Sequence, residues 1–256
     1  MDLPNKELVG KRFFKKKDTY KKQAIIQKQV SEKLTDILLS YTKNISQILE
    51  VGSGVGFLTD CVLSKFDVNQ YYANDITPLL KDELSSVFQK HSYTNYEFLM
   101  GDAETISFPD TLQAITSSST FQWFHDIPSF FVKSHDALEK NGYLAFSSYG
   151  PLNFIEIKKI NNHGLRYLTL AQLKALLKPY FTIEYATEWT EKIYFPTSYD
   201  VLKHIQATGV NSVTVNRHYF GKNNIDKFTR TYSQRFTENN QVYLTYHPII
   251  IIAKKK

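Results

Sequence analysis

The chain has 256 residues, of which 42% are hydrophobic and 22% charged, so it is too apolar for a disordered protein. Its one cysteine, Cys61, excludes a disulfide framework and a cysteine-based metal site, and we expect no metal. No apolar run reaches the roughly 18 residues of a membrane helix, and the N-terminus lacks the apolar core of a secretion signal. We therefore expect a cytoplasmic protein without a membrane partner. The net charge of +6 suits an anionic partner, but no zinc-finger, RNA-binding or helix-turn-helix pattern accompanies it, so nucleic acid is disfavoured.

The first 150 residues alternate between helix and strand patterns. Apolar residues recur at helical spacing through an N-terminal segment, 1–42. Short strand patterns then follow at 47–51, 70–75, 96–100, 112–118 and 143–149. Helices are expected between them, at 54–66, 77–90 and 128–139. This alternation predicts a doubly wound α/β sheet whose strands are mostly parallel.

The rhythm changes after residue 150. Helices are expected at 153–162, 169–178, 198–208 and 223–236, and long strands at 182–195 and 242–253. We expect the last two strands to form a hairpin-like pair, which makes seven strands with the last one antiparallel. Helical cap elements, roughly 151–163 and 198–236, would lie above the strand ends. No linker divides the chain, so we expect a single domain over 1–256.

The most informative segment, residues 48–60, reads ILEVGSGVGFLTD. A buried strand ends in three glycines, Gly52, Gly54 and Gly56, and an amphipathic segment follows. This pattern predicts a strand, a tight turn and a helix start. Glycine lets a ligand approach the backbone closely, and the first turn of a helix offers free N–H groups. The segment therefore predicts a site for a nucleotide-like ligand.

Further polar groups follow the next strands. In open parallel sheets, ligands bind beyond the carboxyl ends of the strands. Asp75 ends the second predicted strand, where a carboxylate can accept both hydroxyls of a ribose, although it could instead cap the helix after it. Asp102, in the segment GDAE, follows the third strand and could accept from an adenine amino group. The segment STFQWF, 119–124, follows the fourth strand.

The glycine spacing bears on the class of ligand. Dinucleotide folds favour Gly-x-Gly-x-x-Gly, whereas the third glycine here comes one residue early. Glu50 precedes the first glycine by two positions. An acid at this place suits a ligand with a cationic amino acid end and no pyrophosphate, such as S-adenosyl-L-methionine. A dehydrogenase is therefore disfavoured.

These motifs together resemble a known family. EVGSGVG, the strand-final Asp75, GDAE and FQWF resemble the successive motifs of class I S-adenosylmethionine-dependent methyltransferases, which have a Rossmann-like fold. More narrowly, the chain resembles the malonyl-acyl-carrier-protein O-methyltransferase family of biotin synthesis, from about Lys6 to Ala253. The specific segments are RFFKKKDTY, NDITP, FSSYGPLNF, LKHIQATGVN and LTYHPI. It departs from the family at the glycine turn, where GSGVG replaces Gly-Cys-Gly-Thr-Gly, at Lys140–Gly142 and at Lys21.

The resemblance implies which residues form the site. The residues implied for the cofactor lie at strand ends or on the N-terminal segment: Tyr20, Glu50, Gly52, Ser53, Gly54, Gly56, Asp75, Ile76, Asp102, Ala103, Ser119 and Phe121. The residues implied for the acceptor come mostly from the last third of the chain: Trp123, His204, Asn211, Arg217, Tyr246 and His247. Positioning without acid or base catalysis would fall to Tyr20, Gln122, Trp123 and His247. Trp123 and Phe124 could instead be core, His247 structural and Arg217 a surface arginine.

The family reaction methylates the free carboxylate of malonyl-acyl carrier protein, and the methyl ester primes pimeloyl synthesis for biotin. A carboxylate is already ionised at neutral pH, so no general base is expected. The acidic acyl carrier protein would be the partner of basic residues near the cap. Two alternatives remain open. One is another S-adenosylmethionine-dependent methyltransferase, acting on a quinone or a small polycarboxylate, and the other is a non-catalytic scaffold that binds the cofactor.

Overall fold

The computed structural model describes residues 4–161, 165–208 and 222–256, and a seven-stranded sheet forms its centre. The order of the strands is β3-β2-β1-β4-β5-β10-β6. Their bounds are β1 (Gln47–Val51), β2 (Gln70–Asp75), β3 (Tyr96–Met100), β4 (Leu112–Ser117), β5 (Leu138–Tyr149), β6 (Phe181–Glu188) and β10 (Pro248–Lys255). β1 to β5 pair in parallel, and β10 is antiparallel to both β5 and β6. The predicted mostly parallel α/β sheet with an antiparallel last strand is confirmed.

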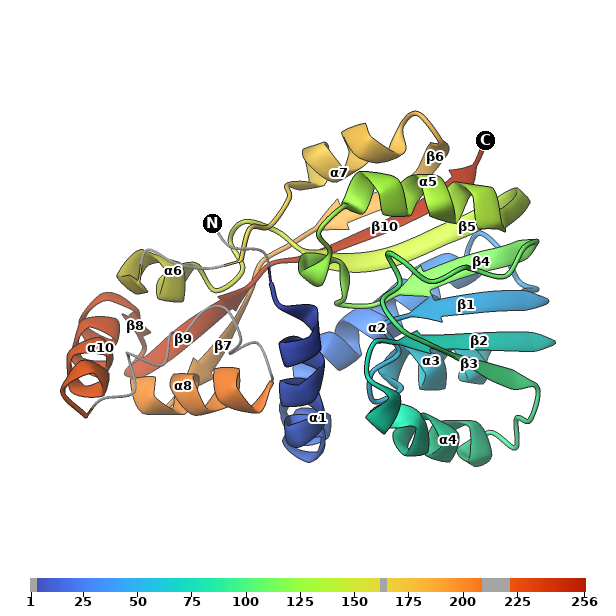
Figure 1. Cartoon of the computed structure of the whole chain (residues 1–256). Coiled ribbons are helices and arrows are strands. Elements are labelled where there is room, and N and C mark those ends of the chain that lie inside the picture. The colour runs from blue at the N-terminus through green and yellow to red at the C-terminus, as the bar shows by residue number, and fades with distance from the viewer. Residues whose placement is uncertain (1–3, 162–164, 209–221) are drawn as a thin grey trace.

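Helices cover both faces of this sheet (Figure 1). One face packs on α2 (Ile25–Leu39), α3 (Phe57–Lys65) and α4 (Lys81–Lys90), and the other packs on α5 (Ile127–Ala137) and α7 (Leu170–Leu177). A hydrophobic core therefore lies on each face of the sheet, and the isoleucines of β10 contribute to both. Ile250 and Ile252 pack in the core beneath α2, α3 and α4, and Ile249 and Ile251 pack in the core beneath α5 and α7. Because successive side chains of a strand point to opposite faces, a strand buried on both faces is apolar throughout.

A second lobe lies at the other end of the molecule (Figure 1). It contains a three-stranded sheet of order β7-β9-β8, with β7 (Glu191–Phe195), β8 (Thr237–Glu238) and β9 (Gln241–Tyr246). The helices α6 (Ile155–Asn161), α8 (Ser198–Ala207) and α10 (Lys222–Arg235) surround this sheet. The predicted cap is therefore a mixed lobe, because it has strands as well as helices.

Two predictions about long strands were wrong. The segments 182–195 and 242–253 were each predicted as one strand, and each is two strands that belong to different sheets. β6 pairs with β10 in the main sheet, and β7 pairs with β9 in the second lobe, all antiparallel. The hairpin-like pairing was right. The strands are interrupted at residues 189–190 and at His247. Apolar periodicity does not indicate where a chain leaves one sheet and enters another, so the sequence did not predict these interruptions.

The N-terminal segment is also divided. It forms α1 (Lys6–Gln23) and α2, which are separated at Ala24, a residue with ψ of 54°. α1 lies between the carboxyl ends of the main sheet and the second lobe (Figure 1). The helix expected from residue 54 begins at Phe57, after the glycine turn. Two short 3-10 turns, Pro78–Leu80 and Phe121–Trp123, follow β2 and β4.

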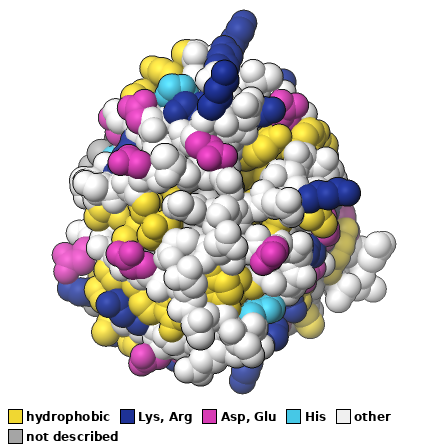
Figure 2. Space-filling model, turned by 90° about the vertical axis from the view of Figure 1, so that its right-hand side faces the viewer, with side chains coloured by type: hydrophobic (Ala, Val, Ile, Leu, Met, Phe, Trp, Pro, Cys, Tyr) yellow, Lys and Arg dark blue, Asp and Glu magenta, His cyan; other side chains and the backbone are white. Residues whose placement is uncertain are grey.

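Acidic and basic side chains are mixed at the edge of the molecule that faces away from α1 and the second lobe (Figure 2). Figure 2 views the edge at which the parallel strands begin, and basic and acidic side chains are interspersed over this face. Within the described ranges, no helix has the length and apolar character needed to cross a membrane.

Candidate active site

A cavity opens at the carboxyl ends of β1, β2, β3 and β4, and α1 covers one side of it. The loops after these strands supply most of the walls, and the rest comes from α1, α2, the start of α3, the end of β5 and the residue after α8. Most of the predicted site residues line it, and they are Tyr20, Glu50, Gly52, Ser53, Gly54, Asp75, Ile76, Asp102, Ala103, Ser119, Gln122 and Trp123. Residues from four strand ends and from the N-terminal segment thus meet in one place, as the sequence pattern predicts.

The glycine turn after β1 needs glycine for two reasons. Gly52 and Gly54 have φ values of 72° and 57°, which residues with a side chain rarely adopt. In addition, a Cβ at Gly52 would overlap the side chain of Thr120. The N–H of Ser53 donates to the carbonyl of Asn74 at 2.8 Å, which ties the turn to the end of β2.

Glu50 is the most deeply buried acid of the cavity, with 1% of its surface exposed. Its Oε2 accepts from the hydroxyl of Thr59 at 2.6 Å and from that of Tyr71 at 2.5 Å. Burial raises the pKa of Glu50 to about 7, and the two hydroxyl groups only partly oppose this rise. An ionised Glu50 is therefore costly without a cation beside it, and the cavity favours a cationic group at this point.

Asp75 holds the glycine turn and the next loop together. One of its oxygens accepts from the N–H of Gly54 at 2.9 Å, and the other accepts from the N–H of Thr77 at 2.8 Å. Burial raises the pKa of Asp75 above its ordinary value, although these N–H groups favour the ionised form. The alternative role of Asp75 as a helix cap is therefore partly confirmed, since one of its oxygens accepts from the N–H of Thr77, just before the 3-10 turn. Asp75 still lines the cavity.

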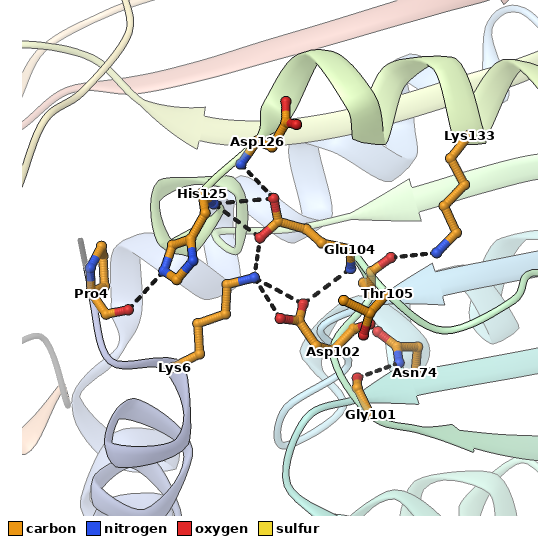
Figure 3. Close-up of polar contacts among 11 residues, drawn as sticks. Pro4, Lys6, Asn74, Gly101, Asp102, Glu104, Thr105, His125, Asp126 and Lys133 are labelled. Atoms are coloured by element: carbon orange, nitrogen blue, oxygen red, sulfur yellow. Dashed lines mark hydrogen bonds and ion pairs between the residues drawn. The ribbon is translucent and has the colours of Figure 1, made fainter.

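Asp102 and Glu104, on the loop after β3, both bind Lys6 of α1 (Figure 3). The Lys6 ammonium lies 2.6 Å from Oδ2 of Asp102. Burial alone would raise the pKa of Asp102, but Lys6 and the N–H of Glu104 outweigh it and lower that pKa. Glu104 also accepts from the N–H groups of His125 and Asp126, as Figure 3 shows. This network fastens the start of α1 to two loops that follow strands.

Tyr20, near the end of α1, packs against aromatic rings. Its ring stacks on Phe57 with centroids 5.6 Å apart and meets Phe13 edge to face at 4.7 Å. Phe13 and Phe57 also line the cavity, so α1 closes this side with apolar surface. Burial raises the pKa of Tyr20 far above that of a free phenol, so its hydroxyl stays protonated and can donate a hydrogen bond.

The loop after β4 divides between cavity and core. Ser119, Gln122 and Trp123 line the cavity, and Gln122 donates to the carbonyl of Ser119 at 2.5 Å. Phe121, predicted near the cofactor, is instead fully buried and stacks on the core ring of Phe146, with centroids 4.3 Å apart. Phe124, which was predicted as a core residue, packs against the core and also lines the cavity wall.

Comparisons with known proteins bear on what this cavity does. A family model described as a methyltransferase domain matches residues 49–146. Over 98% of its length the chain is 34% identical to the malonyl-[acyl-carrier protein] O-methyltransferase of Bacteroides thetaiotaomicron, and it covers 99% of that protein. The protein of the same name from Acinetobacter baylyi is also 34% identical, with 98% and 97% of the two chains covered. The chain belongs to the malonyl-[acyl-carrier protein] O-methyltransferase family.

Solved structures agree on the fold. A methyltransferase structure from Bacillus halodurans superposes with a TM-score of 0.64 at 18% identity, covering 86% of this chain and 98% of that chain. An N-methyltransferase from Bradyrhizobium japonicum, solved with S-adenosylhomocysteine, superposes with a TM-score of 0.55 at 11% identity and covers 88% and 85%. At these identities they support the Rossmann-like class I methyltransferase fold and nothing finer.

Several residues that the family resemblance assigned lie outside the cavity. Gly56 has φ of 84°, and a Cβ there would lie 2.7 Å from Val87, so it serves the packing of α3 on α4. His204 and Tyr246 are buried in the second lobe, where His204 Nε2 lies 2.7 Å from the Tyr246 hydroxyl. Burial lowers the pKa of His204 to about 4, so this histidine is neutral at pH 7. Asn211 and Arg217 lie outside the described residues.

His247 joins the two sheets. It sits between β9 and β10 with its Nε2 3.2 Å from the carboxylate of Glu188, while its Nδ1 accepts from the N–H of Leu152 at 3.1 Å. A Cβ on Gly150 would lie 2.5 Å from the His247 ring, so the chain passes closely over it. These surroundings of His247 match the structural alternative.

Other cavity residues were not assigned to the site from the sequence, although Phe13, Tyr149 and Thr208 lie within segments that resemble the family. They come from α1, α2, β5 and the end of α8, and they include Lys6, Phe13, Gln27, Ser31, Tyr149 and Thr208. Among the described residues, the side-chain oxygens of Gln27 and Gln122 are buried without a hydrogen-bond partner. Both line the cavity, so they offer acceptors to a bound molecule. Only the folding of the N-terminal helices over the strand ends brings these groups to the site.

Proposed function

We propose that this chain transfers a methyl group from S-adenosyl-L-methionine to the free carboxylate of malonyl-acyl carrier protein. The observation that carries this proposal is the convergence of Glu50, Asp75, Asp102 and Tyr20 on one cavity. Similarity to malonyl-[acyl-carrier protein] O-methyltransferases over almost the whole chain supports the choice of acceptor. The methyl ester would prime pimeloyl synthesis for biotin.

The cavity residues fit the cofactor in the order of the strands. Glu50 and the glycine turn would hold the cationic methionine end, since this buried carboxylate gains from a nearby positive charge. Asp75 and Ile76 would lie at the ribose. Asp102 and Ala103 would lie at the adenine, beside Lys6. Ser119 would lie near the sulfonium, and Tyr20 would close over it. The bound cofactor supplies an electrophilic methyl group on a good leaving group.

The acceptor needs orientation and no base. A malonyl carboxylate with an ordinary pKa near 4 is ionised at neutral pH. The protein would then hold a carboxylate oxygen of the malonyl group in line with the methyl group and exclude water. Such positioning lowers the activation free energy by several kcal/mol. Tyr20, Gln122 and Trp123 are the candidates that border the cavity.

His204 and Tyr246 would act at one remove. The Tyr246 ring lies 6.2 Å from that of Tyr149, which lines the cavity and whose hydroxyl lies 3.1 Å from Oγ of Ser119. We therefore assign His204 and Tyr246 to positioning Tyr149, and His247 to joining the two sheets. Asn211 and Arg217 stay predictions from the family resemblance. The second lobe and the sheet would together form one methyltransferase domain.

The product explains why the reaction is useful. Methylation removes the terminal charge of the malonyl group, and an uncharged ester can enter apolar pockets that would exclude an unpaired carboxylate. Enzymes that extend acyl chains have such pockets.

The direct test is to incubate the protein with isotope-labelled S-adenosylmethionine and malonyl-acyl carrier protein, and to follow the ester by mass spectrometry. Label on the malonyl carboxylate is the expected result. Acetyl-acyl carrier protein, which lacks the free carboxylate, is the matched control and should stay unlabelled. Labelling of free malonate or of a quinone, with none on the carrier-bound malonyl group, would contradict the proposed acceptor.

A further inference from the structure

The net positive charge of this chain comes from one helix. α1 contains eight Lys and Arg residues and two acids, a net charge of +6, which equals the formal net charge of all 256 residues. The remainder of the chain is therefore balanced. Figure 2 agrees, because acidic and basic side chains are interspersed over the edge of the molecule opposite the cavity. A surface of one sign on an otherwise balanced protein points to a charged partner.

Half of the basic residues of α1 are engaged within the protein. Lys6 binds Asp102 and Glu104, and Lys17 and Lys21 both bind Glu83 of α4. Lys11 pairs with Glu7 one turn away at 2.5 Å. Three of these four lysines fasten α1 to the main body on either side of the cavity.

The other four basic residues are Arg12, Lys15, Lys16 and Lys22. No acid within the described ranges forms an ion pair with any of them, and the three lysines are exposed. We call these four residues the basic face of α1. Their charge is not needed to hold the fold together.

The basic face extends from the flank of α1 to the side opposite the cavity. Lys6, Phe13 and Tyr20 follow one another at intervals of seven residues, and all three line the cavity. Lys15 and Lys22 each come two residues later than a cavity residue, which turns them by about 200° around the helix axis. Arg12 comes one residue before Phe13 and Lys16 three residues after it, so they lie about 100° and 60° from the cavity side, on the flank of the helix. Because an α-helix with its side chains is about 10–12 Å across, all four residues lie within about that distance of the cavity wall.

We infer that the basic face of α1 is the docking surface for the acidic carrier protein. This inference rests on the proposed function and deepens it by locating the partner. Charge complementarity favours the carrier protein, and α1 is one wall of the cavity that the malonyl group must reach. Docking here sets the carrier beside the site, so its prosthetic arm has only the width of one helix to pass.

The test compares two triple variants of equal charge. One carries Lys15→Glu, Lys16→Glu and Lys22→Glu. The control carries Lys43→Glu, Lys140→Glu and Lys174→Glu, which are exposed lysines away from α1. Binding of malonyl-acyl carrier protein is measured by calorimetry at low and high salt, and methyl transfer is measured to the carrier and to malonyl-pantetheine.

The α1 variant should bind the carrier at least about tenfold more weakly at low salt, and the control less than twofold more weakly. Added salt should narrow the difference, and transfer to malonyl-pantetheine should be unchanged in both. Equal losses in the two variants, or no loss in either, would overturn the docking site. A membrane role for the basic face would also overturn it. In that case wild type would bind phosphatidylglycerol vesicles, and the α1 changes would abolish this binding without altering the affinity for the carrier. Failure of wild type to methylate either acceptor would contradict the proposed function instead, while the binding data would still decide the docking site.

Discussion

Replacing Glu50 with glutamine should have two separable effects. It should remove the destabilisation of the folded protein by an ionised carboxylate, and it should weaken the binding of the cofactor. The pKa of Glu50 is raised from 4.5 to about 7 by burial. Each pKa unit corresponds to about 1.4 kcal/mol, so an ionised Glu50 costs the folded protein about 3 kcal/mol. Glutamine has nearly the same shape, and its amide oxygen can still accept from Thr59 and Tyr71.

The sign of the pH dependence follows from the direction of this shift. Because the folded-state pKa is the higher one, the stabilising effect of the protonated carboxyl is fully present below pH 4.5 and is lost as the pH rises through 7. Without cofactor, Glu50→Gln should therefore match wild type near pH 5. At pH 8 it should be more stable, by up to about 3 kcal/mol or roughly 6–12 °C in Tm.

Cofactor binding should respond in the opposite direction. A cation beside Glu50 lowers its pKa, so wild-type affinity for S-adenosylmethionine should rise between pH 5.5 and 7.5 with release of a proton. Glu50→Gln should lose this dependence and bind about 10–100-fold more weakly, as expected for a lost hydrogen bond to a charged group.

Urea unfolding at pH 5 and pH 8 and calorimetry with S-adenosylmethionine provide the two measurements. Glu97→Gln, an exposed change of the same charge on β3, is the control and should alter neither. A stability difference between Glu50→Gln and wild type that is the same at both pH values would refute the reasoning. It would mean that Glu50 is not strained by ionisation in the folded protein.

Three further changes test other parts of the site. Tyr20→Phe keeps the aromatic packing and should lower kcat/KM about tenfold, as expected for one buried hydrogen bond, in steady-state methyl transfer; unchanged turnover would reduce Tyr20 to packing. Lys6→Met should speed hydrogen exchange in the first turns of α1, whereas Lys11→Met, at an exposed pair, should not; equal exchange in both would show that Lys6 does not fasten the helix. Gly56→Ala should lower the free energy of unfolding in urea by more than Gly54→Ala. Both have positive φ, but only at Gly56 would the new methyl group overlap a neighbour, so a smaller loss there would contradict this account.

The sequence predicted the main sheet well because its signals are local. β1 and β2 end at the glycine turn and at Asp75, and the structure reproduces the predicted bounds of these two strands. β5 begins at Leu138, five residues before its predicted start. The second lobe was harder to predict. β6 and β7, like β9 and β10, form nearly continuous extended chain, and which sheet each half joins depends on partners far away in the sequence.

The candidate site shows the same division. The acids Glu50, Asp75 and Asp102 could be predicted, because each follows a strand and the carboxyl ends of parallel strands meet at one edge. Phe121 and His247 were assigned to the site from motifs, but a motif does not specify whether a side chain faces the cavity or the core. Phe121 packs on Phe146 instead, and His247 lies at the junction of the two sheets.

By itself the sequence determined the alternation of strands and helices over the first 150 residues, the glycine turn and the acids around it, since these depend on residues that are close in the chain. The tertiary structure alone decided that α1 crosses the strand ends, with Lys6 bound to Asp102, apolar rings toward the cavity and unpaired lysines outward. The physical reason is that helical periodicity defines the faces of α1 without specifying what each face meets. That is settled by packing and ion pairs between residues about 100 positions apart.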